Sequence, residues 1–157
     1  MPRISFMTAT AAMAILVAPL LSPASAGQRN SANTNQTATS HAFGLAGSAG
    51  ALSLNNNAVE QGNFRLDGGK PHAGQSNGAN TVSTALSTAL SVGGDAGAAS
   101  FNTNLTGQDN IGASKHPIVQ LNSAPTVQTA VGTAVSIGGD ASAEATNSNG
   151  GAQHNSR

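Results

Sequence analysis

The sequence predicts an all-β protein, built as a stack of β-hairpins or a β-solenoid, and three observations support this prediction. One segment is written three times, at Ser40–Asn63, Ser87–Asn110 and Gly132–Asn155. In its best-preserved copies, aliphatic residues alternate with small polar ones, which is the period of a strand. Gly-Gly-Asp follows the alternating run in the last two copies and supplies a turn. We expect cross-β order on assembly and substantial disorder in a free monomer.

The first 26 residues have the layout of a secretory signal peptide. Arg3 provides the positive start, Ala11–Leu21 the apolar run, and Ser22–Ala26 a small-residue cleavage pattern. Prolines interrupt the apolar run before it reaches the roughly 20 residues of a membrane-spanning helix. We therefore expect residues 1–26 to be removed, leaving no membrane span. The mature chain is expected to be secreted to the cell surface or beyond it, with the periplasm in transit.

The composition offers little material for an ordinary hydrophobic core. The chain has no Cys, Trp or Tyr and only four Phe, and Ala, Gly, Ser, Thr and Asn dominate it. Ordering a residue costs roughly 1–2 kcal/mol of backbone entropy, whereas a buried methylene returns about 0.8 kcal/mol. Disulfides cannot compensate without cysteine. The formal net charge is zero and the charges do not cluster, so no nucleic-acid surface is expected.

The three copies keep a common register, which indicates a true internal repeat. A closing Gln-x-Asn falls at residues 61–63, 108–110 and 153–155, and a spaced Asn pair precedes each of them. Asn and Gln stacked at one height would form side-chain amide ladders parallel to the backbone hydrogen bonds. The predicted structural repeat positions are Asn55, Asn57, Gln61, Asn63, Asn102, Asn104, Gln108, Asn110, Asn147, Asn149, Gln153 and Asn155, with the turn residues Gly93, Gly94, Asp95, Gly138, Gly139 and Asp140.

The segments between the copies are predicted to be less ordered. Residues 27–39 are interpreted as a flexible lead, residues 64–86 and 111–131 as linkers, and residues 156–157 as a tail. Within Thr81–Ala98 and Thr126–Ala143, a helical face competes with the strand pattern. Exchange of Leu for Val between the two favours the strand. In the Gly-Gly-Asp turns we expect Gly to adopt positive φ and Asp to bond its own backbone.

Catalytic and cofactor signals are weak throughout. The four histidines, His41, His72, His116 and His154, are scattered without the spacing of a metal site. The Gly-Gly-Asp turns resemble part of a calcium-binding nonapeptide, but those sites need tandem copies. The chain has no Gly-x-Ser-x-Gly elbow with a paired His and no phosphate-binding loop followed by Lys. We therefore expect no cofactor, no metal and no enzymatic activity.

The repeat pattern resembles that of secreted bacterial functional-amyloid fibre subunits. The features that carry this resemblance are three imperfect repeats behind a signal peptide, Gly/Ala-rich centres, spaced Asn pairs and a closing Gln-x-Asn, over Ser40–Asn155. The chain is similar to the three-repeat Pseudomonas-type biofilm amyloids and more loosely to curlins, although it lacks a Cys-x-Cys near its C-terminus. The resemblance implies self-assembly into extracellular matrix fibres. The chain itself is the expected partner, with a nucleator or an export pore as further candidates.

Two other functional classes stay open at this point. The same repeats could form a monomeric cell-surface adhesin or binding module, which would expose a ligand face. The Gly, Ser and Asn content also suits a largely disordered secreted or periplasmic protein. Conversion of the soluble protein into fibres over time would separate these alternatives from a fibre subunit.

Overall fold

The computed structural model describes residues 4–8, 10–21, 28–66, 74–113 and 118–156, and it is all-β, which confirms the predicted class. The strand interpretation of the repeat therefore holds over the helical one. The strands are β1 (Ile4–Thr8), β2 (Thr10–Leu21), β3 (Gln28–Leu45), β4 (Ala49–Leu66), β5 (Gly74–Val92), β6 (Ala96–Ala113), β7 (Val119–Ser123), β8 (Thr126–Ile137) and β9 (Ala141–Ser156).

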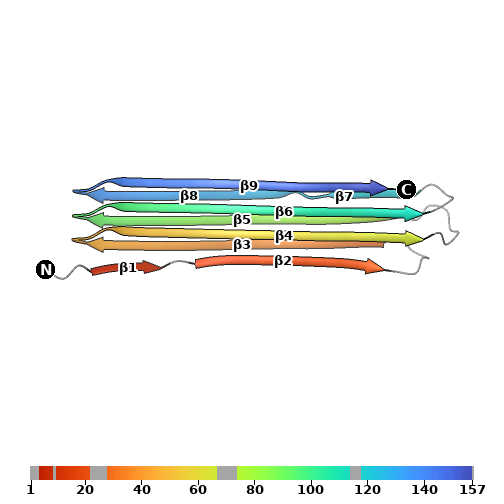
Figure 1. Ribbon diagram of the computed structural model, residues 1–157, viewed down its shortest axis with the longest axis horizontal. Coiled ribbons are helices and arrows are strands. Elements are labelled where there is room, and N and C mark those ends of the chain that lie inside the picture. The colour runs from red at the N-terminus through yellow and green to blue at the C-terminus, as the bar shows by residue number, and fades with distance from the viewer. Residues whose placement is uncertain (1–3, 9, 22–27, 67–73, 114–117, 157) are drawn as a thin grey trace.

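The strands form two facing sheets, and facing strands of the two sheets are stacked one pair above another, with β1 and β2 beside β3 and β4 (Figure 1). One sheet has the order β1-β3-β5-β7, with β8 also paired to β5, and the other has the order β2-β4-β6-β9. We call β3 with β4 the first rung, β5 with β6 the second rung, and β7, β8 and β9 the third rung. In each rung the chain runs out along one sheet, turns, and returns along the other. This arrangement is a stack of β-arches of the solenoid type.

Neighbouring rungs pair in parallel with equivalent residues side by side. Strand β3 pairs with β5 from Gln28 beside Gln75 to Leu45 beside Val92. Strand β4 pairs with β6 at the same offset, and β6 pairs with β9 from Ala96 beside Ala141 onward. The repeat therefore specifies the register, because a slip by one residue would exchange the faces of every strand.

The faces are inverted relative to an ordinary amphipathic sheet. Small and polar side chains point between the two sheets, where Ala38, Ala85 and Ala89 are 0% exposed. The larger apolar side chains lie on the outside, and Phe43 is 42% and Ile137 61% exposed. Alternation along each strand produces these two faces. The buried face therefore consists mainly of small and amide side chains, with Val59 as a buried aliphatic residue among them.

The arch turns depend on two glycine positions. Gly93 and Gly138 have φ of 77° and 85°, as expected, and Ala46 takes the equivalent position of the first rung with φ of 56°. The prediction that Asp bonds the backbone of its own turn is wrong for Asp95. Asp95 Oδ1 accepts a hydrogen bond from the backbone N–H of Asp140 at 3.0 Å, so it bonds the next rung and not its own turn.

The predicted segment boundaries differ from the strands that form. Residues 28–39, expected to be a flexible lead, make up most of β3. The two expected linkers contribute β5 from Gly74 onward, together with β7 and the start of β8. Pro125 interrupts the strand between β7 and β8, yet the register is the same on both sides of it. Each rung is therefore longer than the repeat that the sequence analysis delimited.

The expected signal peptide includes two described strands. Strand β1 pairs with β3 antiparallel, and β2 pairs with β4 in parallel from Thr10 beside Ser53 to Leu21 beside Phe64. Both lie against the first rung (Figure 1). Among the described residues there is no helix that could cross a membrane. The expected cleavage pattern at residues 22–26 lies outside the described part of the chain.

Candidate functional site: the amide ladders and the two ends of the stack

Asn side chains of β4, β6 and β9 form continuous ladders between the sheets. Asn55 Nδ2 donates to Asn102 Oδ1 at 2.9 Å, and Asn102 Nδ2 donates to Asn147 Oδ1 at 2.9 Å. The columns Asn57–Asn104–Asn149 and Asn63–Asn110–Asn155 repeat this arrangement, with donor–acceptor distances of 2.5 to 3.0 Å. In all three columns the amide groups donate from the first rung toward the third.

The Gln column of the same sheet runs in the opposite direction. Gln108 Nε2 donates to Gln61 Oε1 at 2.9 Å, and Gln153 Nε2 donates to Gln108 Oε1 at 3.0 Å. The third rung therefore donates toward the first along this column. The sequence-predicted Asn and Gln positions all meet their equivalents in these four columns.

A second set of ladders lies in the facing sheet, and the sequence analysis missed it. Gln75 Nε2 donates to Gln28 Oε1 at 3.0 Å, and Gln120 Nε2 donates to Gln75 Oε1 at 2.9 Å. Asn77 accepts from Asn30 at 3.1 Å and donates to Asn122 at 3.3 Å. A signal for these ladders was present in the sequence, because Gln-x-Asn also occurs at residues 28–30, 75–77 and 120–122.

The ladder amides also join the two sheets to each other. Asn55 Nδ2 donates to the carbonyl oxygen of Thr84 at 2.6 Å, and Asn102 Nδ2 donates to that of Thr129 at 2.6 Å. Asn77 Nδ2 reaches Asn110 Oδ1 at 3.2 Å across the interior. An amide nitrogen has two hydrogens, so it can serve one ladder neighbour and one group of the facing sheet. The interior is held by polar networks where most proteins have aliphatic packing.

The glycine turns allow the rungs to approach closely. A Cβ on Gly94 would lie 2.5 Å from the carbonyl carbon of Gly47, and a Cβ on Gly139 would lie 2.6 Å from that of Gly94. A side chain at either position would force the backbone of the neighbouring rung to shift. The predicted turn residues therefore meet their equivalents in neighbouring rungs, as the Asn and Gln residues do.

The first end of the stack, formed by the first rung, contains buried side-chain oxygens that accept no hydrogen bond. The Oδ1 atoms of Asn55, Asn57 and Asn63 are buried and have no hydrogen-bond partner. These side chains are at most 2% exposed. Each is the acceptor terminus of its ladder, because its own amide nitrogen donates to the second rung. A buried acceptor without a donor costs stability.

The last end of the stack is open along both sheets. Strands β8 and β9 each pair with a described strand on one side only. The side chains of Asn147, Asn149 and Asn155 are exposed, and each accepts from the second rung through Oδ1. The amide nitrogens of these residues therefore terminate the ladders at this end, where Gln153 presents an acceptor oxygen.

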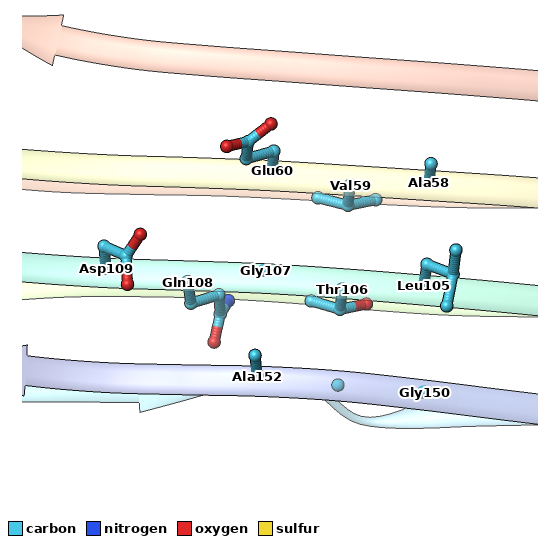
Figure 2. A pocket seen from close by; sticks show the side chains of 11 residues that line it. Ala58, Val59, Glu60, Leu105, Thr106, Gly107, Gln108, Asp109, Gly150 and Ala152 are labelled. Carbon is cyan, nitrogen blue, oxygen red and sulfur yellow. The ribbon is translucent and has the colours of Figure 1, made fainter.

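A hollow of about 550 Å³ lies on the outer face of β4, β6 and β9 (Figure 2). It forms because Gly107, Gly150 and Ala152 leave the surface low between the side chains of Glu60 and Leu105. Nearby, His154 Nδ1 lies 4.0 Å from Asp109 Oδ1, and both side chains are exposed, so this pair contributes little. The hollow is open and has few polar groups that could fix a ligand.

Metal binding and catalysis find no geometric support in the described residues. No three His, Cys, Asp or Glu side chains converge there. His41 and His154 are exposed on strands β3 and β9, and His72 and His116 lie outside the described part of the chain. The absence of metal, cofactor and enzymatic activity stays a prediction.

Comparisons with protein families, curated proteins and solved structures find no match to this chain.

Proposed function

We propose that the mature chain is a secreted, non-enzymatic structural protein whose copies stack into extracellular fibres of the biofilm-matrix type. The observation that supports this proposal is the open third rung. Strands β8 and β9 pair with a described strand on one side only, and the inner face of this rung carries the ends of the amide ladders. An unprotected strand edge is a template for another chain.

The stacking of rungs within the chain supports this proposal. Neighbouring rungs already pair in register with identical residues at the ladder positions, as fibre-forming segments of separate chains do. The third rung repeats the ladder residues of the second rung unchanged at Asn147, Asn149, Gln153 and Asn155. These residues favour continued stacking.

The experiment is an aggregation time course of purified residues 27–157, with fibre diffraction at its end. A fibre subunit should convert with time and give a meridional reflection at about 4.7–4.8 Å, with a sheet spacing of about 10 Å. Residues 27–157 that remain a soluble monomer and bind a defined surface ligand would favour the adhesin alternative. A protein that stays soluble and unordered would overturn the proposal in favour of disorder.

A further inference from the structure

We propose that strand β2 occupies the binding site of a second copy of this chain, so that the expected signal peptide, residues 1–26 (the leader), blocks one end of the stack when it is not removed. This inference rests on the proposed fibre function and specifies its interface and its control. In the processed protein, the third rung of one copy would take the place of β2 on the first rung of the next. Growth would then be polar, with the last end of each copy on the first end of its neighbour.

The first argument is the position of β2. It pairs with β4 in parallel over Ser53–Phe64, which is the relationship that β6 has to β4 on the other side and β9 has to β6. The leader therefore takes the place of a preceding β9. Strand β1 occupies the corresponding edge of β3 only over His41–Leu45, and it does so antiparallel.

The second argument is that β2 replaces only the backbone pairing of a preceding β9 and not its ladder side chains. Its register sets Ala12, Ala14 and Leu20 beside Asn55, Asn57 and Asn63. Alanine and leucine belong to residue types that have no side-chain hydrogen-bond donor. The Oδ1 atoms of the three asparagines are accordingly among the buried side-chain atoms that lack a hydrogen-bond partner. The leader provides backbone pairing but leaves the ladders unfinished.

The third argument is that the last end of a second copy supplies what β2 lacks. In continued register, Asn147, Asn149 and Asn155 of that copy would stand beside Asn55, Asn57 and Asn63. The amide nitrogens of the third rung terminate ladders that donate in this same direction. The Gln column matches as well, because its opposite polarity places the Gln153 oxygen beside the Gln61 amide. The two ends are complementary only in this orientation.

Charge distribution is consistent with the same contact. Within the stack, Glu60 stands beside Gly107, which stands beside Ala152, and Asp109 stands beside His154. Continued register would place the next Glu60 beside Ala152 and the next Gly62 beside His154. No like-charged pair arises in these columns, whereas stacked like charges would oppose growth.

The test uses labelled, fragmented fibres of residues 27–157 as seeds and follows each fibre end by two-colour microscopy. The full 157-residue chain should extend the seeds at least tenfold more slowly than the processed chain. When both are mixed, the full chain should stop growth at one end only. Its own open third rung can bind the exposed first rung of a seed, and its leader then blocks the next addition.

The control for the leader is the full chain with Met13→Pro and Ala14→Pro. Adjacent strand residues direct their N–H groups to opposite sides, so one of the two prolines removes a bond to β4. This variant should extend both ends. Growth of the unsubstituted full chain at the processed rate, or no block at either end, would overturn the inference while the fibre function stands. A processed chain that forms no fibres would overturn both.

The interface itself is tested by Asn149→Asp. This substitution keeps the oxygen that accepts from Asn104 and removes the donor intended for Asn57 of the next copy. The elongation rate of the processed chain should fall at least tenfold. Ser148→Asp adds the same charge on the outer face of β9 and should retain most of the rate. Equal rates for the two variants would contradict the proposed contact.

Discussion

Asn102 donates from Nδ2 to Oδ1 of Asn147 at 2.9 Å, although 45 residues separate the two along the chain. Asn102 also accepts from Asn55 at 2.9 Å and donates to the Thr129 carbonyl at 2.6 Å. One side chain thus connects three rungs and both sheets. A replacement for Asn102 that donates fewer hydrogen bonds would therefore disturb several partners at once.

Asn102→Asp should lower the free energy of unfolding by at least about 2 kcal/mol, because it removes a buried donor and adds a buried charge. Asn56→Asp is the matched control, since Asn56 is exposed on the outer face of β4. Surface substitutions of this kind change stability by about 0.5 kcal/mol or less. Urea unfolding followed by circular dichroism measures both. Equal effects at the two positions would contradict the inward ladder.

Gly94→Ala should destabilise the arch, because its Cβ would lie 2.5 Å from the Gly47 carbonyl carbon and 2.7 Å from its oxygen. Overpacking against backbone costs about 1–3 kcal/mol. Gly97→Ala is the control, since a Cβ there meets nothing within 4 Å. That variant should be neutral or slightly more stable. Thermal unfolding midpoints compare the two, and a tolerated Gly94→Ala would mean that the rungs are farther apart at the turn.

Ala89→Leu should be poorly tolerated because Ala89 is fully buried between the sheets. The added volume would force the sheets apart, at a cost of about 1–3 kcal/mol. Thr88→Leu places the same side chain at the neighbouring exposed position of β5. It should leave the unfolding free energy nearly unchanged while promoting association through a larger apolar surface. The reverse ranking, measured by urea unfolding and light scattering, would place the aliphatic face inside.

The alternation of Val127 through Ile137 was sufficient to predict strands, but it could not tell which face is buried. The usual rule places aliphatic residues inside. Here the buried face is the one with Ala85, Ala89 and the amides, whose side chains hydrogen-bond along the columns and across to the facing sheet. Alternation shows that a strand has two faces, but it does not show which of them is buried.

The composition also does not indicate at which residue each repeat begins. Gln28–Thr39 is polar and aperiodic in hydrophobicity, so its sequence predicts a flexible lead, although it pairs residue by residue with β5. The direction of each ladder and the unpaired oxygens of Asn55 and Asn57 lie beyond any sequence pattern, because they depend on amide orientation. What the sequence did carry was the recurrence of Gln-x-Asn at residues 28–30, 75–77 and 120–122.

Asn77→Asp tests this part of the fold, since a linker interpretation and a ladder interpretation predict different results. Asn77 is 0% exposed. It accepts from Asn30 and Asn63 at 3.1 and 3.0 Å and donates to the Asp109 carbonyl at 2.9 Å. The substitution removes the donor and buries a charge, so it should cost at least about 2 kcal/mol, as at Asn102.

Asn80→Asp is the control in the same strand, because Asn80 is exposed on the outer face of β5. It should change the free energy of unfolding by about 0.5 kcal/mol or less. Hydrogen exchange adds a local measurement, since loss of the Asn77 ladder should raise exchange in β5 and β7 before β6. If both variants behave like the unsubstituted protein, residues 74–80 form the flexible linker that their composition suggests. A large loss confined to Asn77→Asp would establish that each rung begins at its first Gln-x-Asn.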